Sequence, residues 1–195
     1  MYTSCAGTLA GNIAQDCANP LVGGYTGRGL LIPWDNIKSL VKDVANPRIV
    51  SAITLETDAK LAVIDNAFTE PLTGSQTGSS SDTGRAAYTK TVAFRIPLRG
   101  AKASKDVVEP MLTQAGGFLL VLEKNDKVGD GSFEIIGSLQ PFKVNADGVT
   151  RDEAANGGDI TVTGASTEPF FEVTFFDTDY EKTKTAFNTL MANSF

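Results

Sequence analysis

The chain has 195 residues, 42% of them apolar, which is enough to bury the core of one domain. It contains no histidine, which excludes Ser–His–Asp and Cys–His nucleophiles and almost every zinc site that uses imidazole. The formal net charge is −6 and the 17 basic residues are scattered, so DNA could pass the surface but specific nucleic-acid binding is not expected.

The N-terminal segment is predicted to be separate from the main domain. Residues 1–28 are rich in Gly, Ala, Asn and Thr without a sustained period, which indicates an irregular arm, and residues 29–195 are expected to form a single β-rich domain. The start lacks a signal-peptide pattern and no window resembles a membrane span, so we expect a soluble protein without a membrane partner. Cys5 and Cys17 could pair or stay as free thiols, and their spacing leaves both open.

The first part of the domain is predicted to contain a short helix between strands. Residues 29–32 read as a strand, and Asp35 could cap a helix that Asn46-Pro47 ends. Two β-branched runs, residues 49–55 and 60–65, are typical of a hairpin. The apolar residues at helical spacing are Ile37, Leu40, Val41 and Val44.

A long polar segment precedes the most regular alternating stretch of the chain. Residues 73–85 are almost free of apolar side chains and are predicted to form an exposed polar loop. The next strand alternates with period two, and Lys90 is the single misfit on its apolar face. The other residues of that face are Tyr88, Val92, Phe94, Ile96 and Leu98.

The second half of the chain alternates strands with two helices. A helix is predicted from Asp106 to Ala115, with Pro110 in its first turn and Gly116-Gly117 after its end. Thr178 and Glu181 form a capping box for a C-terminal amphipathic helix that would cover a sheet. Strands or extended segments are predicted at residues 118–123, 132–137, 139–144, 159–163 and 169–176.

These elements predict a mostly β, α+β fold, arranged as a β-sandwich or open barrel with flanking helices. The predicted strand at 169–176 is apolar on both faces, so both faces must be covered, one by a sheet and the other by the terminal helix or by a neighbouring subunit. The candidate residues for this subunit contact are Phe170, Phe171, Phe175 and Phe176.

No motif supports catalysis, so we expect no enzyme activity, no metal and no other cofactor. The carboxylates of residues 177–179 are better explained as helix caps than as metal ligands. Residues 125–134 lack the bidentate Glu of a calcium loop, and residues 73–84 lack the Lys of a P-loop. The glycines of residues 23–29 precede a strand, which is the wrong context for dinucleotide binding.

From about Gly29 onward, the order of elements resembles that of the tail tube, or major tail, proteins of tailed bacteriophages. The likeness is carried by "GGFLLVLEKND", "GSFEIIGSLQPF" and "TRDEAANGGDITVT", followed by a strand and a final helix. The chain is most similar in texture to virion proteins of phages that infect Bacteroides-like hosts. This resemblance implies rings, usually of six subunits, whose inner strands form a continuous β-barrel channel for DNA and which stack into a tube.

The resemblance also implies partners and a location. The partners would be copies of the chain and other phage tail proteins, in a virion whose proteins are made in the bacterial host cytoplasm. Such proteins expose a long loop that reaches the adjacent ring, and the polar segment could gain order through such contacts. The candidate self-association residues are Ser75, Gln76, Ser79, Ser80, Ser81, Asp82 and Arg85.

Two other function classes stay open at this point. A capsid decoration or head-to-tail connector protein could be built from similar β modules. A carbohydrate-binding β-sandwich would need exposed aromatic residues at loop tips and a calcium site, whereas the aromatic residues here fall mainly within predicted strands.

Overall fold

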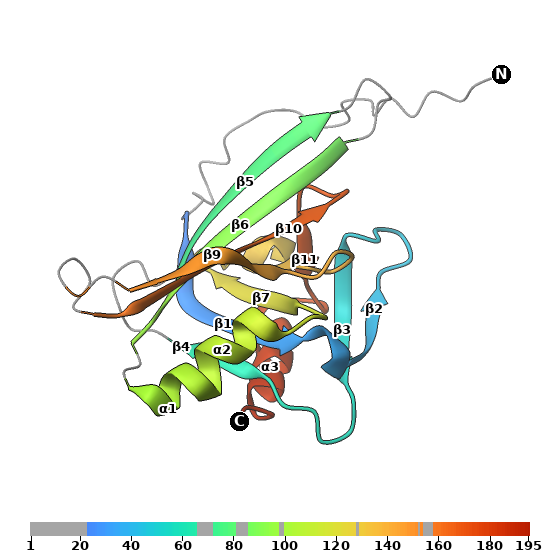
Figure 1. The fold of residues 1–195 in the computed structure, drawn as a ribbon. Helices are drawn as coiled ribbons and strands as arrows, with labels where there is room; N and C mark the ends of the chain where they lie inside the picture. Colours follow the sequence, from blue (N-terminus) through green and yellow to red (C-terminus); the bar gives the residue numbers. More distant parts are fainter. Residues whose placement is uncertain are drawn as a thin grey trace.

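The computed structural model describes residues 23–65, 72–80, 86–97, 100–127, 129–151, 153 and 158–195. These residues form a mostly β fold with helices, which confirms the predicted α+β class (Figure 1). Their strands make two sheets, one of seven strands and one of four, and neither sheet closes into a barrel. The first strand begins at Tyr25, so the predicted arm is wrong for residues 25–28; residues 1–22 lie outside the described part.

The larger sheet has the strand order β2-β3-β11-β8-β7-β1-β4. Its neighbouring strands are antiparallel except β11 and β3, which run parallel. β7 is buried almost from end to end because both faces of this sheet are covered. The strands are β1 (Tyr25–Pro33), β2 (Ile37–Lys42), β3 (Ile49–Leu55), β4 (Ala62–Asp65), β7 (Phe118–Lys124), β8 (Phe133–Ile136) and β11 (Val173–Phe175).

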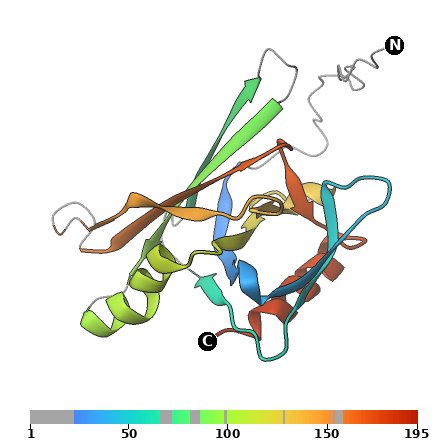
Figure 2. The same ribbon diagram turned by 45° about the vertical axis from the view of Figure 1, so that its right-hand side comes forward.

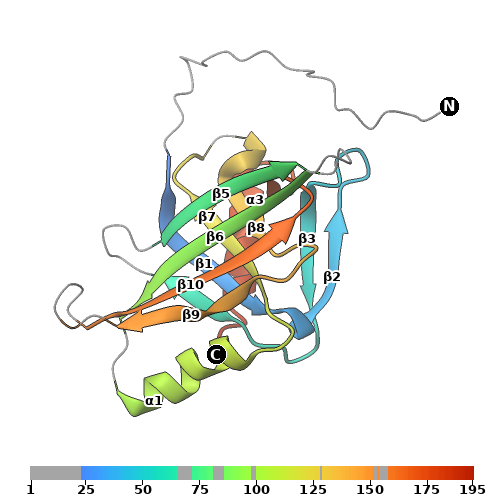
Figure 3. The same cartoon turned by 45° about the horizontal axis from the view of Figure 1, so that its top comes forward.

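The smaller sheet is antiparallel throughout and has the order β5-β6-β10-β9. In Figure 2 its β5–β6 hairpin extends away from the larger sheet. Figure 3 looks onto this sheet, with the C-terminal helix on the far side of the molecule. The strands are β5 (Leu72–Ser80), β6 (Ala86–Ile96), β9 (Lys143–Arg151) and β10 (Ile160–Glu168).

The predicted loop at 73–85 is wrong for its first eight residues. They belong to β5, which pairs with β6 in unbroken register from Leu72 opposite Phe94 to Ser80 opposite Ala86. The low apolar content reflects the position of β5 at the edge of the sheet, where most of its side chains are exposed. Backbone hydrogen bonds to β6 hold this strand in place, although few of its side chains pack in the core. Residues 81–85 lie outside the described part of the chain.

The helix predicted after Asp35 is also wrong. Trp34–Asn36 form a short 3-10 turn, and Ile37, Leu40 and Val41 lie in β2, paired with β3. Val44 lies beyond the end of β2 and is fully exposed. The pairing register shifts between Ile37 and Ser39 and again between Val41 and Lys42. These irregularities break the period-two alternation, so a strand carries apolar residues at a spacing that is typical of a helix.

Two helical segments flank the sheets. The first comprises α1 (Ala101–Ala103), a π-helical turn (Ser104–Val108) and α2 (Glu109–Thr113), so it begins five residues before the predicted start. Pro110 is the second residue of α2, which follows the π turn, and the first turn of a helix tolerates a residue without an N–H. The second segment is α3 (Tyr180–Met191), as predicted.

The cap of α3 differs from the prediction by one residue. Asp179, not Thr178, is the N-cap, and its carboxylate accepts a hydrogen bond from the backbone N–H of Lys182 at 2.8 Å. The Thr178 hydroxyl instead donates to Asp177 at 2.9 Å. A carboxylate at this position also opposes the positive end of the helix dipole, so Asp179 combines both effects.

Two apolar clusters cover the two faces of the larger sheet. The first contains residues of both sheets and of α2, including Leu120, Phe94 and Met111. The second lies under α3 and includes Phe133, Phe175 and Phe187, whose rings pack with centroids 5.1 to 6.5 Å apart. Phe133 and Phe187 are completely buried. The larger sheet is therefore the central layer of the molecule.

The close contact between Gly164 of β10 and Phe142 generates a stability prediction. A Cβ at Gly164 would overlap the buried Phe142 ring and lie 2.6 Å from the carbonyl oxygen of Lys143. We expect Gly164→Ala to lower the free energy of unfolding by about 1–3 kcal/mol through overpacking. Urea unfolding measures the change. Gly131→Ala is the matched control, because its Cβ would meet nothing within 4 Å; an equal loss in both variants would contradict the packing argument.

Candidate functional site

The most unusual group in the described chain is the buried ammonium of Lys90. Lys90 occupies an inward-facing position of β6, in line with Val92 and Phe94, and is 0% exposed. Its Nζ lies 3.3 Å from Glu134 Oε1 on β8 and 3.5 Å from the carbonyl oxygen of Ile135. Because Lys90 belongs to the smaller sheet and Glu134 to the larger one, this ion pair joins the two sheets.

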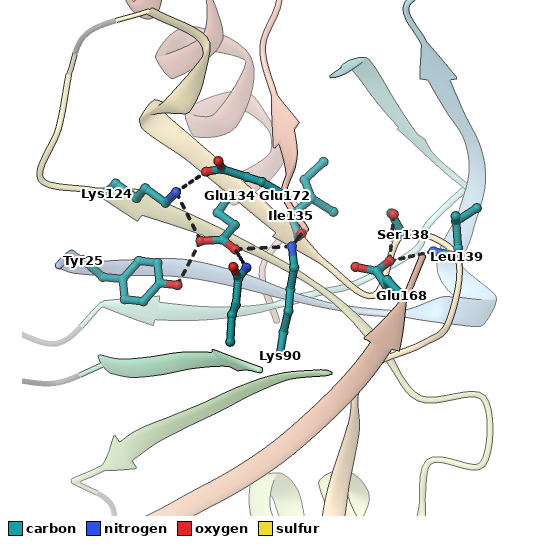
Figure 4. Close-up of polar contacts among 10 residues, drawn as sticks. Tyr25, Lys90, Lys124, Glu134, Ile135, Ser138, Leu139, Glu168 and Glu172 are labelled. Carbon is teal, nitrogen blue, oxygen red and sulfur yellow. Dashed lines mark hydrogen bonds and ion pairs between the residues drawn. The ribbon is translucent and has the colours of Figure 1, made fainter. Parts of the chain in front are cut away.

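Glu134 is the centre of a wider polar cluster, shown in Figure 4. Its carboxylate accepts hydrogen bonds from Tyr25 Oη at 3.0 Å and from Gln76 Nε2 at 2.9 Å. Lys124 Nζ lies 3.3 Å from Glu134 Oε2 and also contacts Glu172 Oε1. Side chains from β1, β5, β6 and β7 thus meet at a single carboxylate on β8.

Burial and the neighbouring carboxylates shift the pKa values of Tyr25 and Lys124. Burial raises the pKa of Tyr25 far above its usual range, and the negative charge of Glu134 and the hydrogen bond to it act in the same direction. Burial alone would lower the pKa of Lys124, but the charges of Glu134 and Glu172 outweigh it and raise the pKa. Tyr25 therefore stays neutral and Lys124 stays an ammonium ion at neutral pH.

A pocket of about 270 Å³ opens beside this cluster. Tyr25, Gln76, Lys90, Lys124 and Glu134 line its polar part. Phe171 also contributes to the wall; it is 52% exposed and packs edge-on against Tyr88, with ring centroids 5.5 Å apart. The pocket gives solvent a route to the polar end of the space between the sheets.

A second buried carboxylate, Glu123 of β7, lies on the face of the larger sheet that α3 covers, opposite to the face of Glu134. It accepts hydrogen bonds from Tyr180 Oη at 3.1 Å and from Arg28 Nη1 at 3.3 Å. Burial raises the pKa of Tyr180 to about 12, and the hydrogen bond to Glu123 and the charge of that carboxylate act in the same direction. Since Tyr180 is the first residue of α3, this contact ties the helix to the larger sheet.

Glu168, at the end of β10, is a third buried carboxylate and is 1% exposed. Its Oε1 accepts hydrogen bonds from Ser138 Oγ at 2.8 Å and from the backbone N–H of Leu139 at 3.0 Å. Within the described residues its Oε2 has no hydrogen-bond partner. The described part of the chain holds no group of three or more Cys, Asp or Glu residues arranged to bind a metal ion.

Of the predicted self-association residues that the structure describes, Gln76 alone belongs to the polar cluster. Gln76 is half-buried and bonds Glu134, whereas Ser75 and Ser79 are exposed on β5. Ser80 is the last residue of β5. The other three candidates, Ser81, Asp82 and Arg85, lie outside the described residues.

The four phenylalanines do not share one strand as predicted, because β11 spans only Val173–Phe175. Phe175 is 1% exposed within this chain, and Phe170 packs against the cluster under α3 with Arg48 5.2 Å from its ring centroid. Phe176 is half-buried, and of the four only Phe171 is mostly exposed. Contacts within the chain thus cover most of the surface that was assigned to a neighbouring subunit.

Sequence reasoning noted Lys90 but missed its partners. Tyr25 lies in the predicted arm, and Glu134 lies within a predicted strand, residues 132–137, that is otherwise mostly apolar. A sequence signal for the pair did exist: Lys90 and Glu134 carry opposite charges, and each stands in a strand where its neighbours are core residues. Finding that Lys90 and Glu134 meet required the arrangement of the two sheets.

The Lys90–Glu134 pair predicts which of two substitutions lowers the free energy of unfolding more. Glu134→Gln removes the carboxylate that contacts Lys90, and leaving a buried charge without its partner costs about 3–5 kcal/mol. Lys90→Met should cost less, because Glu134 keeps Lys124, Tyr25 and Gln76. Urea unfolding of both variants measures the difference. Lys182→Met is the control, since its ammonium is exposed and lies 3.9 Å from Asp179; the reverse order of the two core variants would contradict the assignment.

The Tyr180–Glu123 contact predicts a pH dependence at high pH. In the unfolded chain a tyrosine ionises at about pH 10, whereas the pKa of Tyr180 is raised to about 12 in the folded chain. The folded state therefore holds this proton more tightly, and the free energy of unfolding should fall as the pH rises from 10 to 12. Tyr180→Phe should make this fall shallower, as measured by denaturant unfolding across that range. An unchanged slope would contradict the prediction.

No helix in the described part of the chain is both long and apolar enough to cross a membrane. A scan against protein-family models, a search of the curated proteins and a search of the solved structures each find no match to this chain.

Proposed function

We propose that the chain is a structural virion protein that assembles with copies of itself into rings stacked as a bacteriophage tail tube. The observation that supports this most is the β5 edge of the smaller sheet, beyond which no described strand lies. β5 runs for nine residues at that edge and contains no charged residue and no proline. Natural proteins usually protect long edge strands with charges, prolines or covering segments, so such an edge is expected to pair with another chain.

The opposite edge of the smaller sheet is open as well. β9 is the last strand on that side, and no described strand pairs with its outer edge. A ring forms when the β5 edge of one copy pairs with the β9 edge of the next, which is a head-to-tail contact that closes after a fixed number of copies. In this proposal six copies join their four-stranded sheets into one continuous barrel.

The outer face of the smaller sheet fits the wall of a channel for DNA. The register places small hydroxyl and methyl side chains across this face from β5 through β6 to β10. Two described residues of this face are basic: Arg95 pairs with Asp159 at 2.9 Å, and Lys143 of β9 lies opposite Ala165. A wall with so few unbalanced positive charges does not hold the phosphate backbone. The residues are Thr73, Ser75, Thr77, Thr89, Thr91, Ala93, Thr161, Thr163, Ala165 and Thr167.

In this arrangement the two sheets and the flanking α3 form the sandwich of a tail tube subunit. The smaller sheet faces the channel, and the larger sheet with α3 faces outward. The ring contacts come from strand edges, not from a loop that gains order on stacking, because residues 73–80 are already paired with β6. Other tail proteins are the expected partners at the ends of the tube, and the location is the virion, after synthesis in the bacterial host cytoplasm.

Charges on the edge strand test the proposal. We expect Ser75→Lys/Thr77→Lys to prevent ring formation, because lysines on an edge strand oppose pairing with another strand. Thr89→Lys/Thr91→Lys is the matched control: these residues lie directly opposite Thr77 and Ser75 on the same face, but on the inner strand β6. Negative-stain electron microscopy and sedimentation velocity measure the assembly.

Rings or tubes in the parent and control proteins, with monomers in the edge variant, support the proposal. A parent protein that stays monomeric over the accessible concentration range contradicts the proposed function. Rings that persist in the edge variant contradict pairing through β5. Isolated rings that never stack favour a connector over a tube.

A further inference from the structure

One carboxylate oxygen of Glu134 contacts both an amine and a primary amide. Glu134 Oε1 lies 3.3 Å from Lys90 Nζ and 2.9 Å from Gln76 Nε2. These are the three groups that amide exchange requires: a nucleophilic amine, a carboxamide with a nitrogen leaving group, and a carboxylate able to move a proton between them. The ion pair between Glu123 and Arg28 on the other face of the larger sheet lacks an amine nucleophile.

The strand register brings the amine and the amide within reach of each other. Gln76 of β5 and Lys90 of β6 are directly opposite in the antiparallel pair. Directly opposite residues have Cβ atoms about 4.5–5.5 Å apart, and their side chains lie on the same face of the sheet. A lysine and a glutamine side chain are together long enough to span this separation. The joined side chains would cross-link two strands that are already hydrogen-bonded.

The surroundings favour reaction of these two groups with each other. Lys90 is 0% exposed and lies in line with Val92 and Phe94, so bulk water does not solvate its ammonium. The carboxylate that must accept a proton from the amine is already in contact with it, since Glu134 Oε1 lies 3.3 Å from Nζ. Gln76 and Lys90 also line the open pocket, which gives a small leaving group a path to solvent.

We propose that Lys90 and Gln76 form an intramolecular isopeptide bond, with Glu134 as the proton carrier. Glu134 accepts a proton from the Lys90 ammonium, and the lone pair of Nζ attacks Cδ of Gln76. The C–N bond to Nε2 then breaks, and that nitrogen takes the proton on Glu134 together with the one released by Nζ and leaves as an ammonium ion. The products are one secondary amide, ammonium and the regenerated carboxylate, so atoms and charge balance and no oxidant or other reactant is needed.

Lys124 is a second amine near Glu134, but its contacts differ from those of Lys90 in two respects. It contacts the other carboxylate oxygen, Oε2, and its ammonium also contacts Glu172. These two carboxylates raise the pKa of Lys124, which keeps it protonated and not nucleophilic. Lys124 instead holds Glu134 in place and is a positioning residue.

The mass of the intact protein tests the bond directly. Because lysine attack on a carboxamide expels ammonia, we expect the purified parent protein to weigh about 17 Da less than its sequence mass. Trypsin cleaves after Arg85 but not after a lysine whose amine is acylated. The digest should therefore contain residues 61–85 joined to residues 86–95, and fragmentation should locate the link between Gln76 and Lys90.

Three variants separate the proposal from other reactions. Gln76→Leu removes the amide and Glu134→Gln removes the proton carrier, so both should keep their full sequence mass. Glu172→Gln is the matched control: it alters the same pocket but does not contact Lys90, and it should still lose ammonia. Far-UV circular dichroism checks that each variant keeps its strands.

Two results overturn the proposal. The first is a full sequence mass for the folded parent protein, both when fresh and after days at physiological temperature. The second is a loss of ammonia that maps elsewhere, above all to an imide at Asn156-Gly157, a sequence that can lose the same mass and is cleaved by hydroxylamine. The test does not involve assembly, so its outcome is independent of the proposed tail tube function.

Discussion

Before any bond to Gln76 forms, the structure depends on how the fold accommodates one charge, the ammonium of Lys90, in the space between its two sheets. An unpaired charge there would be very costly, so the larger sheet must present Glu134 at that point. Tyr25, Gln76 and Lys124 then satisfy the remaining acceptor capacity of the carboxylate. Apolar packing in the first cluster is non-directional, whereas these contacts require one relative position of the sheets.

The same cluster lies at the base of the projecting β5–β6 hairpin. Gln76 and Lys90 come from its two strands, so their contacts with Glu134 connect the hairpin to the body of the molecule. Beyond them, β5 offers an uncharged outer edge to solvent. A hairpin held in this way, with no described strand beyond its β5 edge, would have to gain little order on the association proposed above.

Each face of the larger sheet has a polar contact that complements its apolar cluster. On the side of the smaller sheet this is Glu134, and on the side of α3 it is Glu123 with Tyr180 and Arg28. The carboxylates come from the adjacent strands β8 and β7 but point to opposite faces, because successive residues of a strand alternate between its faces. The central layer is thus linked to both outer layers by directional bonds as well as by packing.

By itself the sequence determined the β-rich class, the strands β3, β6, β7 and β8, and the C-terminal helix, because their periodicity or β-branched composition is local information. It also marked Lys90 as the exception on an apolar face. Only the tertiary structure decided that β2 and β5 are strands, since irregular register disguises the first and an edge position removes the apolar signal from the second. The tertiary structure also decided which residue pairs with Lys90. Glu134 lies 44 residues away in the sequence, and only the packing of one sheet on the other brings the two charges together.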